Sequence, residues 1–350
     1  MNADFALLEE LTEAHGAPGH EERIRGIVRR ELDAVADEIR TDAMGNVVAT
    51  VEGAENPAYE VAVAAHMDEI GFMVRHVTED GFLQLDALGG WDPRVLRAQR
   101  VTVHASEGDL DGVIGSPPPH TMGEEEREKE DDVEDVYVDL GLDGETVAER
   151  VSVGDVVTMD QDTRLLGETV TGKSMDDRVC LFAMLEAAKR VTPDVTVHFA
   201  ATVQEEVGLR GARALGVDLD PDLAVALDVT VANDIPQIGD ESKAVTELGE
   251  GAAIKLKDGS VITNPKVRKR MQSVAEADDI PYQLEVLPAG GTDTAGFQNT
   301  HGAKPVGAIS VPLRYMHTVT ETAHADDVDA TVDLLAAFLD TETGEHDYRL

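Results

Sequence analysis

Apolar segments of strand length, separated by helical patterns, constrain the fold of this chain more than any other feature. The run YEVAVAAHMDEI is continuously apolar and then becomes polar, which is typical of a buried strand that presents side chains at its carboxyl end. Comparable runs follow in VTVHFAATV, LAVALDV and KPVGAISVP, and apolar residues at helical spacing predict helices over residues 178–190, 265–277 and 327–339. This alternation predicts an α/β fold in which a mixed central sheet carries helices on both faces.

The middle of the chain has a different pattern. Between residues 71 and 162, segments such as GFMVRHVTEDGFLQLDALGG and RVTVHASEGDLDGVIGS alternate apolar and polar residues between glycine turns, which predicts short β-strands. The part before them contains two amphipathic helical patterns and a hairpin across Gly45. We therefore expect a small β-rich domain at residues 72–162, inserted into a discontinuous domain formed by residues 1–71 and 163–350.

The N-terminal sequence and the cysteine content indicate a cytoplasmic protein. The first residues, MNADFALLEELTEAHG, contain no basic region followed by a long apolar stretch, so we expect neither a signal peptide nor a membrane anchor. Cys180 is the single cysteine, which rules out an internal disulfide and a zinc site built from several cysteines. With 350 residues, 42% of them hydrophobic, the chain can bury a large core.

The charge balance is strongly acidic, since 70 Asp and Glu residues against 29 Lys and Arg residues give a formal net charge of -41. This charge disfavours nucleic acids and anionic membrane surfaces as partners. We interpret it as an adaptation to the salt-rich cytoplasm of a halophile, where screening over roughly 3 Å at about 1 M salt suppresses self-repulsion; an ordinary acidic protein is the alternative. The densest charge run, GEEEREKEDDVED at 123–135, predicts a solvated loop.

Residue types that bind metals occur at five positions where strands are expected to end. These positions are His66 with Asp68, Asp176 with Asp177, Glu205 with Glu206, Asp228, and His317. Each has an ordinary alternative, because aspartates often cap helices or close turns and a histidine at a strand end often has a structural role. Adjacent Glu205 and Glu206 are harder to explain in this way, since two carboxylates after an apolar strand repel each other unless a cation lies nearby. Two histidines and several carboxylates suit two divalent ions such as Zn²⁺, provided that one carboxylate bridges them.

Seven segments, in order along the chain, resemble the signatures of one family. They are HMDEIGFMV, GGWDPRVL, GKSMDDRVC, TVQEEVGLRGA, ALDVT, GGTDTAG and PLRYMHTVTE. Together they are similar to the tetrahedral (TET-type) dinuclear metallo-aminopeptidases, which include glutamyl and deblocking aminopeptidases. The match runs from near Gly19 almost to the C-terminus. The departures are small: Cys180 follows DDRV where glycine is more usual, and HTVTE replaces the commoner HSPVE.

The resemblance implies a zinc-exopeptidase-like catalytic domain at residues 1–71 and 163–350. Its activity would be the removal of N-terminal residues from peptides with two divalent metal ions, most commonly Zn²⁺, with Co²⁺ or Mn²⁺ as alternatives. The implied ligands are His66 and Asp228 for one ion, Glu206 and His317 for the other, and Asp176 as the bridge. The resemblance also implies Glu205 as the general base and Asp68 as the carboxylate that fixes the tautomer of the His66 imidazole.

These roles suit the hydrolysis of an amide. Two metal ions lower the pKa of a water between them towards about 7 and stabilise the developing oxyanion. Glu205 would take the proton of that water and transfer it to the leaving amine, while Glu206 stays ionised as a ligand. Asp293 in the GGTDT segment is expected to shape the site. His120 in SPPPHT is either a substrate-facing residue or a turn histidine.

Other functions remain as alternatives, the first being a carboxypeptidase or another amidohydrolase that uses the same dinuclear site. Arg178 and Arg314 could capture a C-terminal carboxylate, as a carboxypeptidase would, or they could form structural ion pairs beside the acidic site. An endoglucanase-type glycosidase would use Glu205 and a second carboxylate, but it leaves both histidines unexplained. A non-catalytic metal-binding scaffold would be expected to lack the base or the bridge, yet Glu205 and Asp176 are both present.

The resemblance also has implications for assembly. It implies that the insertion at residues 72–162 is a dimerisation domain and that dimers assemble into a hollow, tetrahedral dodecamer. Such a shell would admit short or unfolded peptides as substrates and exclude folded proteins.

Overall fold

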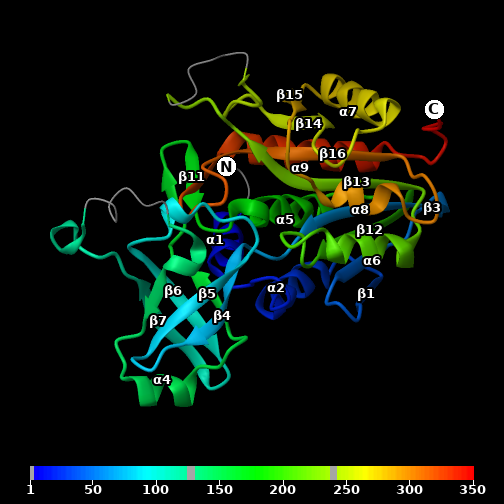
Figure 1. The fold of residues 1–350 in the computed structure, drawn as a ribbon. Helices are drawn as coiled ribbons and strands as arrows, with labels where there is room; N and C mark the ends of the chain where they lie inside the picture. The colour runs from blue at the N-terminus through cyan, green and yellow to red at the C-terminus, as the bar shows by residue number, and fades with distance from the viewer. Residues whose placement is uncertain (1–3, 124–130, 237–242) are drawn as a thin grey trace.

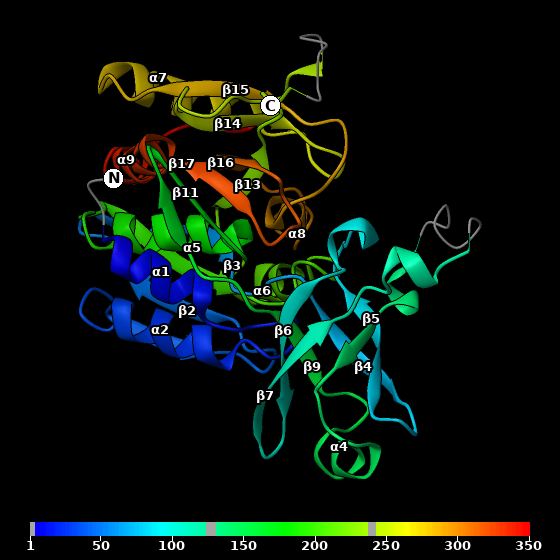
Figure 2. The same ribbon diagram turned by 90° about the vertical axis from the view of Figure 1, so that its left-hand side faces the viewer.

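The computed structural model describes residues 4–123, 131–236 and 243–350, so most of the charge run at 123–135 lies outside the described residues. Within them the strands form two sheets: a large mixed sheet flanked by helices, and a closed barrel that projects away from it (Figure 1 and Figure 2). Among the helices of the described ranges, none is both long and apolar enough to cross a membrane.

The large sheet has 11 strands in the described part of the chain. The spatial order along its main path is β1 (Glu38–Thr41), β2 (Val47–Val51), β12 (Val195–Thr202), β3 (Asn56–His66), β13 (Leu223–Val231), β16 (Val306–Arg314), β17 (Glu321–His324), β11 (Thr169–Gly172) and β10 (Arg164–Leu166). The other two strands, β14 (Ala252–Lys257) and β15 (Tyr282–Val286), pair with each other, and β14 also pairs with β16. Neighbours among β12, β3, β13 and β16 run parallel, whereas β2 and β17 join this group antiparallel. The predicted mixed sheet is confirmed.

Helices cover both faces of this sheet. In β3, Val61, Val63 and Ala65 belong to one buried cluster and Ala62 and Ala64 to another, as the alternation of side chains along a strand requires. The first cluster includes residues of α1 (Phe5–Glu13), α2 (Glu22–Leu32), α5 (Met175–Ala188), α7 (Pro265–Ala277) and α9 (Ala325–Asp340). The second includes residues of α6 (Arg210–Leu219) and α8 (Asp293–Gln298). This arrangement confirms the predicted two-sided α/β fold.

The barrel is formed by the segment in which apolar and polar residues alternate. Its strands follow the order β4 (Gly71–Val77), β5 (Phe82–Leu88), β8 (Tyr137–Asp139), β7 (Gly108–Ile114), β6 (Gln99–Ala105) and β9 (Val156–Met159). Between them lie η1 (Pro93–Val95), η2 (Pro119–Thr121), η3 (Val133–Asp135) and α4 (Gly144–Arg150). Phe72 and Val74 of β4 pack with Leu83 and Leu85 of β5 in a hydrophobic core separate from those of the central sheet, to which Val319 is added from outside the barrel. Because the barrel closes on itself, its strands pair on both sides.

Candidate metal centre

Four parallel strands bring most of the candidate residues to one edge of the central sheet. The carboxyl ends of β3, β12, β13 and β16 lie on the same side, because these strands run parallel. His66 is the last residue of β3, and Asp228 lies close to the end of β13. Glu205 and Glu206 follow β12, and His317 follows β16. The strand ends therefore position these side chains near one another.

Asp176, at the start of α5, faces both histidines. Its Oδ1 lies 3.3 Å from Nε2 of His66, and its Oδ2 lies 3.3 Å from Nε2 of His317. Nε2 of His317 is in turn 3.7 Å from Oε2 of Glu206. The backbone of Asp176 is not helical, with φ -77° and ψ 104°, so its side chain is presented from a turn. One carboxylate thus offers one oxygen to each imidazole.

Two groups of metal-binding side chains share this aspartate. The first group is His66, Asp176, Asp177 and Asp228, and the second is Asp176, Glu206 and His317. Within each group the ligand atoms lie within 4.8 Å of one another. Atoms bound to one zinc ion at about 2.0–2.2 Å lie roughly 3–4 Å apart, so small side-chain movements would close either group around an ion. The structure thus brings together all five residues that the resemblance implies as ligands.

The orientation of the His66 imidazole depends on the main chain of Asp68. Nδ1 of His66 lies 2.9 Å from the carbonyl oxygen of Asp68 and 3.6 Å from its carboxylate. We therefore assign the acceptor of the Nδ1 proton to the carbonyl, which differs from the expectation that the carboxylate would serve. The carboxylate accepts instead from the backbone N–H groups of Glu205, at 3.0 Å, and Glu206, at 3.2 Å. Asp68 therefore contacts the His66 imidazole through its carbonyl and the backbone of Glu205 and Glu206 through its carboxylate.

Two further acidic residues also hold this arrangement together: Glu321, which we did not predict as a site residue, and Asp177, to which we assigned no role. Glu321 of β17 accepts hydrogen bonds from the backbone N–H groups of Asp176, at 3.0 Å, and His317, at 2.7 Å. Asp177 accepts from the backbone N–H of His66 at 3.1 Å. Glu321 closes the HTVTE segment and Asp177 follows Asp176 directly, so position within a motif was the available signal for both.

The electrostatics of the site favour a bound cation. Burial, reinforced by nearby carboxylates, raises the pKa of Glu205, Glu206 and Asp228 well above the usual range. Burial opposes a charged imidazole at His317, but Asp176 and Glu206 outweigh it and raise its pKa to about 10. Oε1 of Glu206 is buried and has no hydrogen-bond partner among the described residues. Carboxylates crowded in this way are stabilised as anions by positive charge between them, so the donor set fits divalent metal ions.

Backbone conformations that are rare for residues other than glycine surround the site. Ser174, two residues before Asp176, has φ 51°, Gln204 before Glu205 has φ 56°, and His317 itself has φ 60°. Such conformations persist where the surrounding structure enforces them, and they are concentrated at functional sites.

Asp293 lies beside the metal-binding groups. Its charge contributes to the raised pKa of Glu205 and of Asp228, and burial raises its own pKa to about 6. Its Oδ2 accepts a hydrogen bond from the hydroxyl of Thr202, whereas its Oδ1 is buried with no partner among the described residues. Its role in shaping the site stays a prediction.

The other candidates lie apart from these groups or are engaged elsewhere. The guanidinium of Arg314 pairs with Asp234 at 2.7 and 2.5 Å, and that of Arg178 is fully buried. Neither is presented to capture a substrate carboxylate. His120 is exposed in η2 and belongs to neither metal-binding group. Cys180 is buried, and burial raises the pKa of its thiol well above the usual range, which is the behaviour of a core residue.

Comparison with known proteins identifies the family. Residues 45–334 match the model of the M42 glutamyl aminopeptidases. The chain belongs to this family. The lysyl aminopeptidase of Pyrococcus furiosus is 37% identical to the M42 chain over 344 residues, which cover 96% of this chain and 97% of the relative. The M42 chain is therefore an aminopeptidase, a hydrolase of peptide bonds, rather than a carboxypeptidase.

Solved structures agree with this assignment. An aminopeptidase from the archaeon Desulfurococcus kamchatkensis matches the M42 chain with a TM-score of 0.92 and 36% identity, over 97% of this chain and 95% of that one. The TET1 peptidase of Pyrococcus horikoshii, described as assembling into a tetrahedron or a large octahedral shell, matches with a TM-score of 0.87 and 34% identity, over 97% and 99%. The M42 chain thus has the fold of the TET aminopeptidases.

Proposed function

We propose that this M42 aminopeptidase uses two divalent metal ions, Zn²⁺ in preference to Co²⁺ or Mn²⁺, to cleave N-terminal residues from peptides. The single observation that carries the proposal is the position of Asp176, which is common to both metal-binding groups and directs one oxygen to each histidine. A carboxylate in that position can bridge two ions. His66 and Asp228 would complete the first ion's ligands, and Glu206 and His317 the second's.

Glu205 is the proposed general base. Two bound ions would supply a polarised carbonyl and a water of lowered pKa. The carboxylate of Glu205 takes the proton of the attacking water and delivers it to the leaving amine. Burial raises the pKa of Glu205 above its usual range, which makes its carboxylate a stronger acceptor for that proton. The Asp68 carboxylate holds the backbone of Glu205 while this proton moves.

Selection for a free N-terminus is proposed to follow from the charge of the site. An α-ammonium group is attracted to the carboxylates that surround His66 and His317, and its position fixes the scissile bond one residue away. Arg178 and Arg314, the cations that could have bound a C-terminal carboxylate, are engaged with protein groups. The geometry therefore favours an aminopeptidase over a carboxypeptidase.

We also propose that residues 72–162 form a dimerisation domain inserted into a catalytic domain made of residues 1–71 and 163–350. The barrel's own core and closed sheet support its independence as a unit. Dimers would assemble into a tetrahedral dodecamer, a proposal supported by the similarity to the P. horikoshii TET1 peptidase, which can form a tetrahedron. The proposed setting is the salt-rich cytoplasm of a halophile, in keeping with the formal charge of -41 and the absence of disulfides from a chain with one cysteine.

The test is the release of p-nitroaniline from aminoacyl-p-nitroanilides with free or acetylated N-termini, in high-salt buffer. Each sample is assayed before chelation, after it, and after addition of Zn²⁺, Co²⁺ or Mn²⁺, and metal content is measured by mass spectrometry. We expect cleavage of free amines alone, loss on chelation, and recovery with two ions per chain. Full activity after complete removal of metal would refute the proposal, and a maximum of one bound ion would refute its dinuclear part.

A further inference from the structure

We propose that Glu69, Lys173 and Arg178 are positioning residues that hold the turn carrying Asp176, and thereby set the affinity of the site for metal. The inference rests on the proposed dinuclear function. Asp176 is the central ligand of that proposal, yet it lies on a turn, at Ser174 to Asp177, and not at the end of a sheet strand. Its position therefore depends on contacts to the turn, of which the hydrogen bond to Glu321 is one.

A buried ion network flanks this turn on both sides. Nζ of Lys173 lies 2.9 Å from Oε1 of Glu69 and 2.7 Å from Oε2, and both side chains are 3% exposed. Nη2 of Arg178, which is fully buried, lies 3.7 Å from Oε1 of the same carboxylate. Lys173 precedes Asp176 by three residues and Arg178 follows it by two. The Glu69 carboxylate therefore contacts one cation that precedes Asp176 in the chain and one that follows it.

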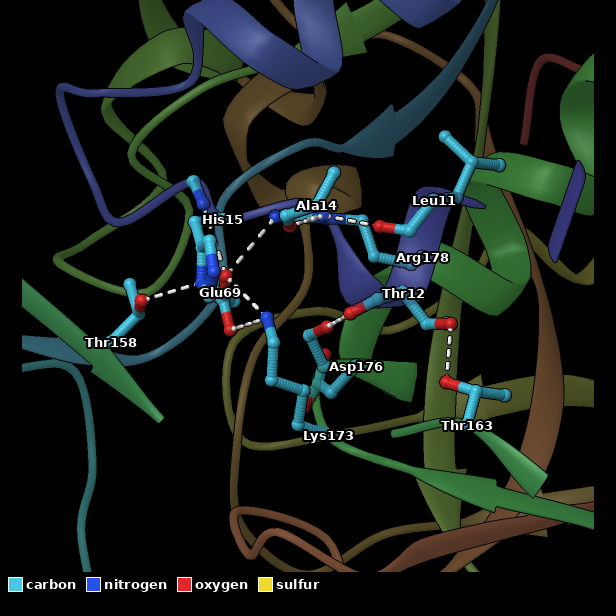
Figure 3. Close-up of polar contacts among 12 residues, drawn as sticks. Leu11, Thr12, Ala14, His15, Glu69, Thr158, Thr163, Lys173, Asp176 and Arg178 are labelled. Carbon is cyan, nitrogen blue, oxygen red and sulfur yellow. Dashed lines mark hydrogen bonds and ion pairs between the residues drawn. The ribbon is translucent and has the colours of Figure 1, made fainter. Parts of the chain in front are cut away.

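The network is anchored to the segments around it (Figure 3). The guanidinium of Arg178 donates to the carbonyl of Leu11 at 2.6 Å, of Ala14 at 2.9 Å and of Met67 at 2.7 Å. Met67 lies between His66 and Asp68, so the same guanidinium that follows the Asp176 turn also holds the end of β3. The turn and the neighbouring ligand are thus fixed to a common group.

Further hydrogen bonds connect the turn to the junction with the barrel. The Ser174 hydroxyl donates to the carbonyl of Thr12 at 2.6 Å, and the Thr12 and Thr163 hydroxyls lie 2.7 Å apart. Thr163 follows β9, the last strand of the barrel, so the turn is tied to the point where the chain returns to the central sheet. Glu69, Lys173, Ser174 and Asp176 line one pocket, so the ion pair and the turn face the same space.

A role in positioning is distinguishable from a role in stability. Buried ion pairs can often be replaced by apolar side chains at little cost in folding free energy, because desolvation offsets the attraction of the charges. Groups that orient metal ligands behave differently, and their loss typically weakens metal binding by about 10- to 100-fold. Metal affinity is therefore the decisive measurement.

The experiment compares the full chain with Lys173→Met, which leaves Glu69 and Arg178 as a balanced pair. Zinc affinity is measured by competition with a chromophoric chelator, and ligand geometry by the visible absorption of the Co²⁺-loaded protein. We expect Lys173→Met to weaken zinc binding by about 10- to 100-fold and to alter the cobalt spectrum. Lys173→Arg, which keeps the charge beside Glu69, is expected to restore much of the affinity.

The control is Glu342→Gln, which removes a buried charged group away from the proposed metal centre, a carboxylate bonded to the Tyr348 hydroxyl at 2.5 Å. Tyr348 lines a pocket with Tyr59 of β3, and Tyr59 and His66 are seven residues apart on that strand, or about 23 Å. We expect Glu342→Gln to leave zinc affinity and the cobalt spectrum unchanged.

Each measurement either supports or overturns the inference. Wild-type affinity and spectrum in Lys173→Met would overturn the inference, as would an equal loss in Glu342→Gln. If Lys173→Met does not fold, Glu69→Asp, which keeps every charge but shortens the carboxylate arm, is measured in the same way, and wild-type values there would also overturn it. A wild-type chain that binds no metal would instead refute the proposed function itself.

Discussion

His15 is expected to make the stability of this chain depend on pH below neutrality. Its imidazole is partly buried against the barrel, with Nδ1 2.8 Å from the Thr158 hydroxyl of β9 and its ring centroid 4.9 Å from that of His104 of β6. Burial, assisted by the charge of Lys173, lowers the pKa of His15 from 6.5 to about 4. The unfolded chain therefore takes up a proton near pH 6.5, whereas the folded chain resists it until about pH 4.

The sign of the effect follows from this difference. The stability that a neutral His15 allows is fully present above pH 6.5 and is lost as the pH falls towards 4. At about 1.4 kcal/mol per pKa unit, the loss reaches roughly 2 kcal/mol at pH 5 and about 3 kcal/mol below pH 4. His15→Gln, which cannot titrate, should lack this part of the dependence.

Guanidinium unfolding at pH 7 and pH 5, in constant high salt with chelator, measures the prediction. The metal-binding carboxylates are common to both proteins, so their titration cancels when the pH dependence of His15→Gln is subtracted from that of the wild type. His76→Gln, at an exposed position of β4, controls for the removal of a histidine. If the wild type and His15→Gln lose the same free energy of unfolding between pH 7 and pH 5, the assigned burial of a neutral imidazole is wrong.

Three further predictions concern the metal centre. Glu205→Gln should retain its bound metal while kcat falls by about 10²- to 10⁴-fold; loss of metal together with activity would contradict the role of base. Gly90→Ala would place a methyl group 3.1 Å from Nδ1 of His317 and should weaken zinc binding by about 10-fold or more. Gly26→Ala, whose added methyl group has no atom within 4 Å, should leave zinc binding unchanged. Equal zinc affinities of the two variants in a chelator competition would contradict the close contact at Gly90. Zinc at about 100 times its Kd should stabilise the fold against guanidinium by about 2.7 kcal/mol for each site that it occupies, and an unchanged midpoint would show that the metal does not bind the native state preferentially.

The large elements and the candidate metal-binding residues were visible in the sequence for the same reason. Strands such as β3 and β12 are buried on both faces, so they read as continuous apolar runs, and the polar residues that end them are conspicuous. Helix α7 begins at Pro265 after the Asn264 cap and ends at Ala277, and its periodic apolar residues gave the same limits. Burial imposes apolar runs on strands and periodic apolar residues on helices, and both patterns can be recognised in a single amino-acid sequence.

Elements without such patterns were missed. Strand β15 alternates only weakly and has one buried residue, and β10 is exposed throughout, so neither forms an apolar run. Helix α8 has six residues, too few to show a helical period. The orienting role of the Asp68 carbonyl could not be predicted either, because a main-chain group has no residue-specific signal.

The residues of the site fall into two groups according to the contacts that hold their backbones in place. His66 and Asp228 lie on strands of the central sheet, where the ladders to neighbouring strands hold the backbone. Asp176 and His317 lie on turns, and the carboxylate of Glu321 accepts the backbone N–H of both. The ion network around Glu69 adds a second support to the Asp176 turn, and through Arg178 it also reaches the main chain just after β3. Substitutions in these supports should therefore affect the proposed bridging residue Asp176 first, and His66 and Asp228, which the sheet also holds, to a smaller extent.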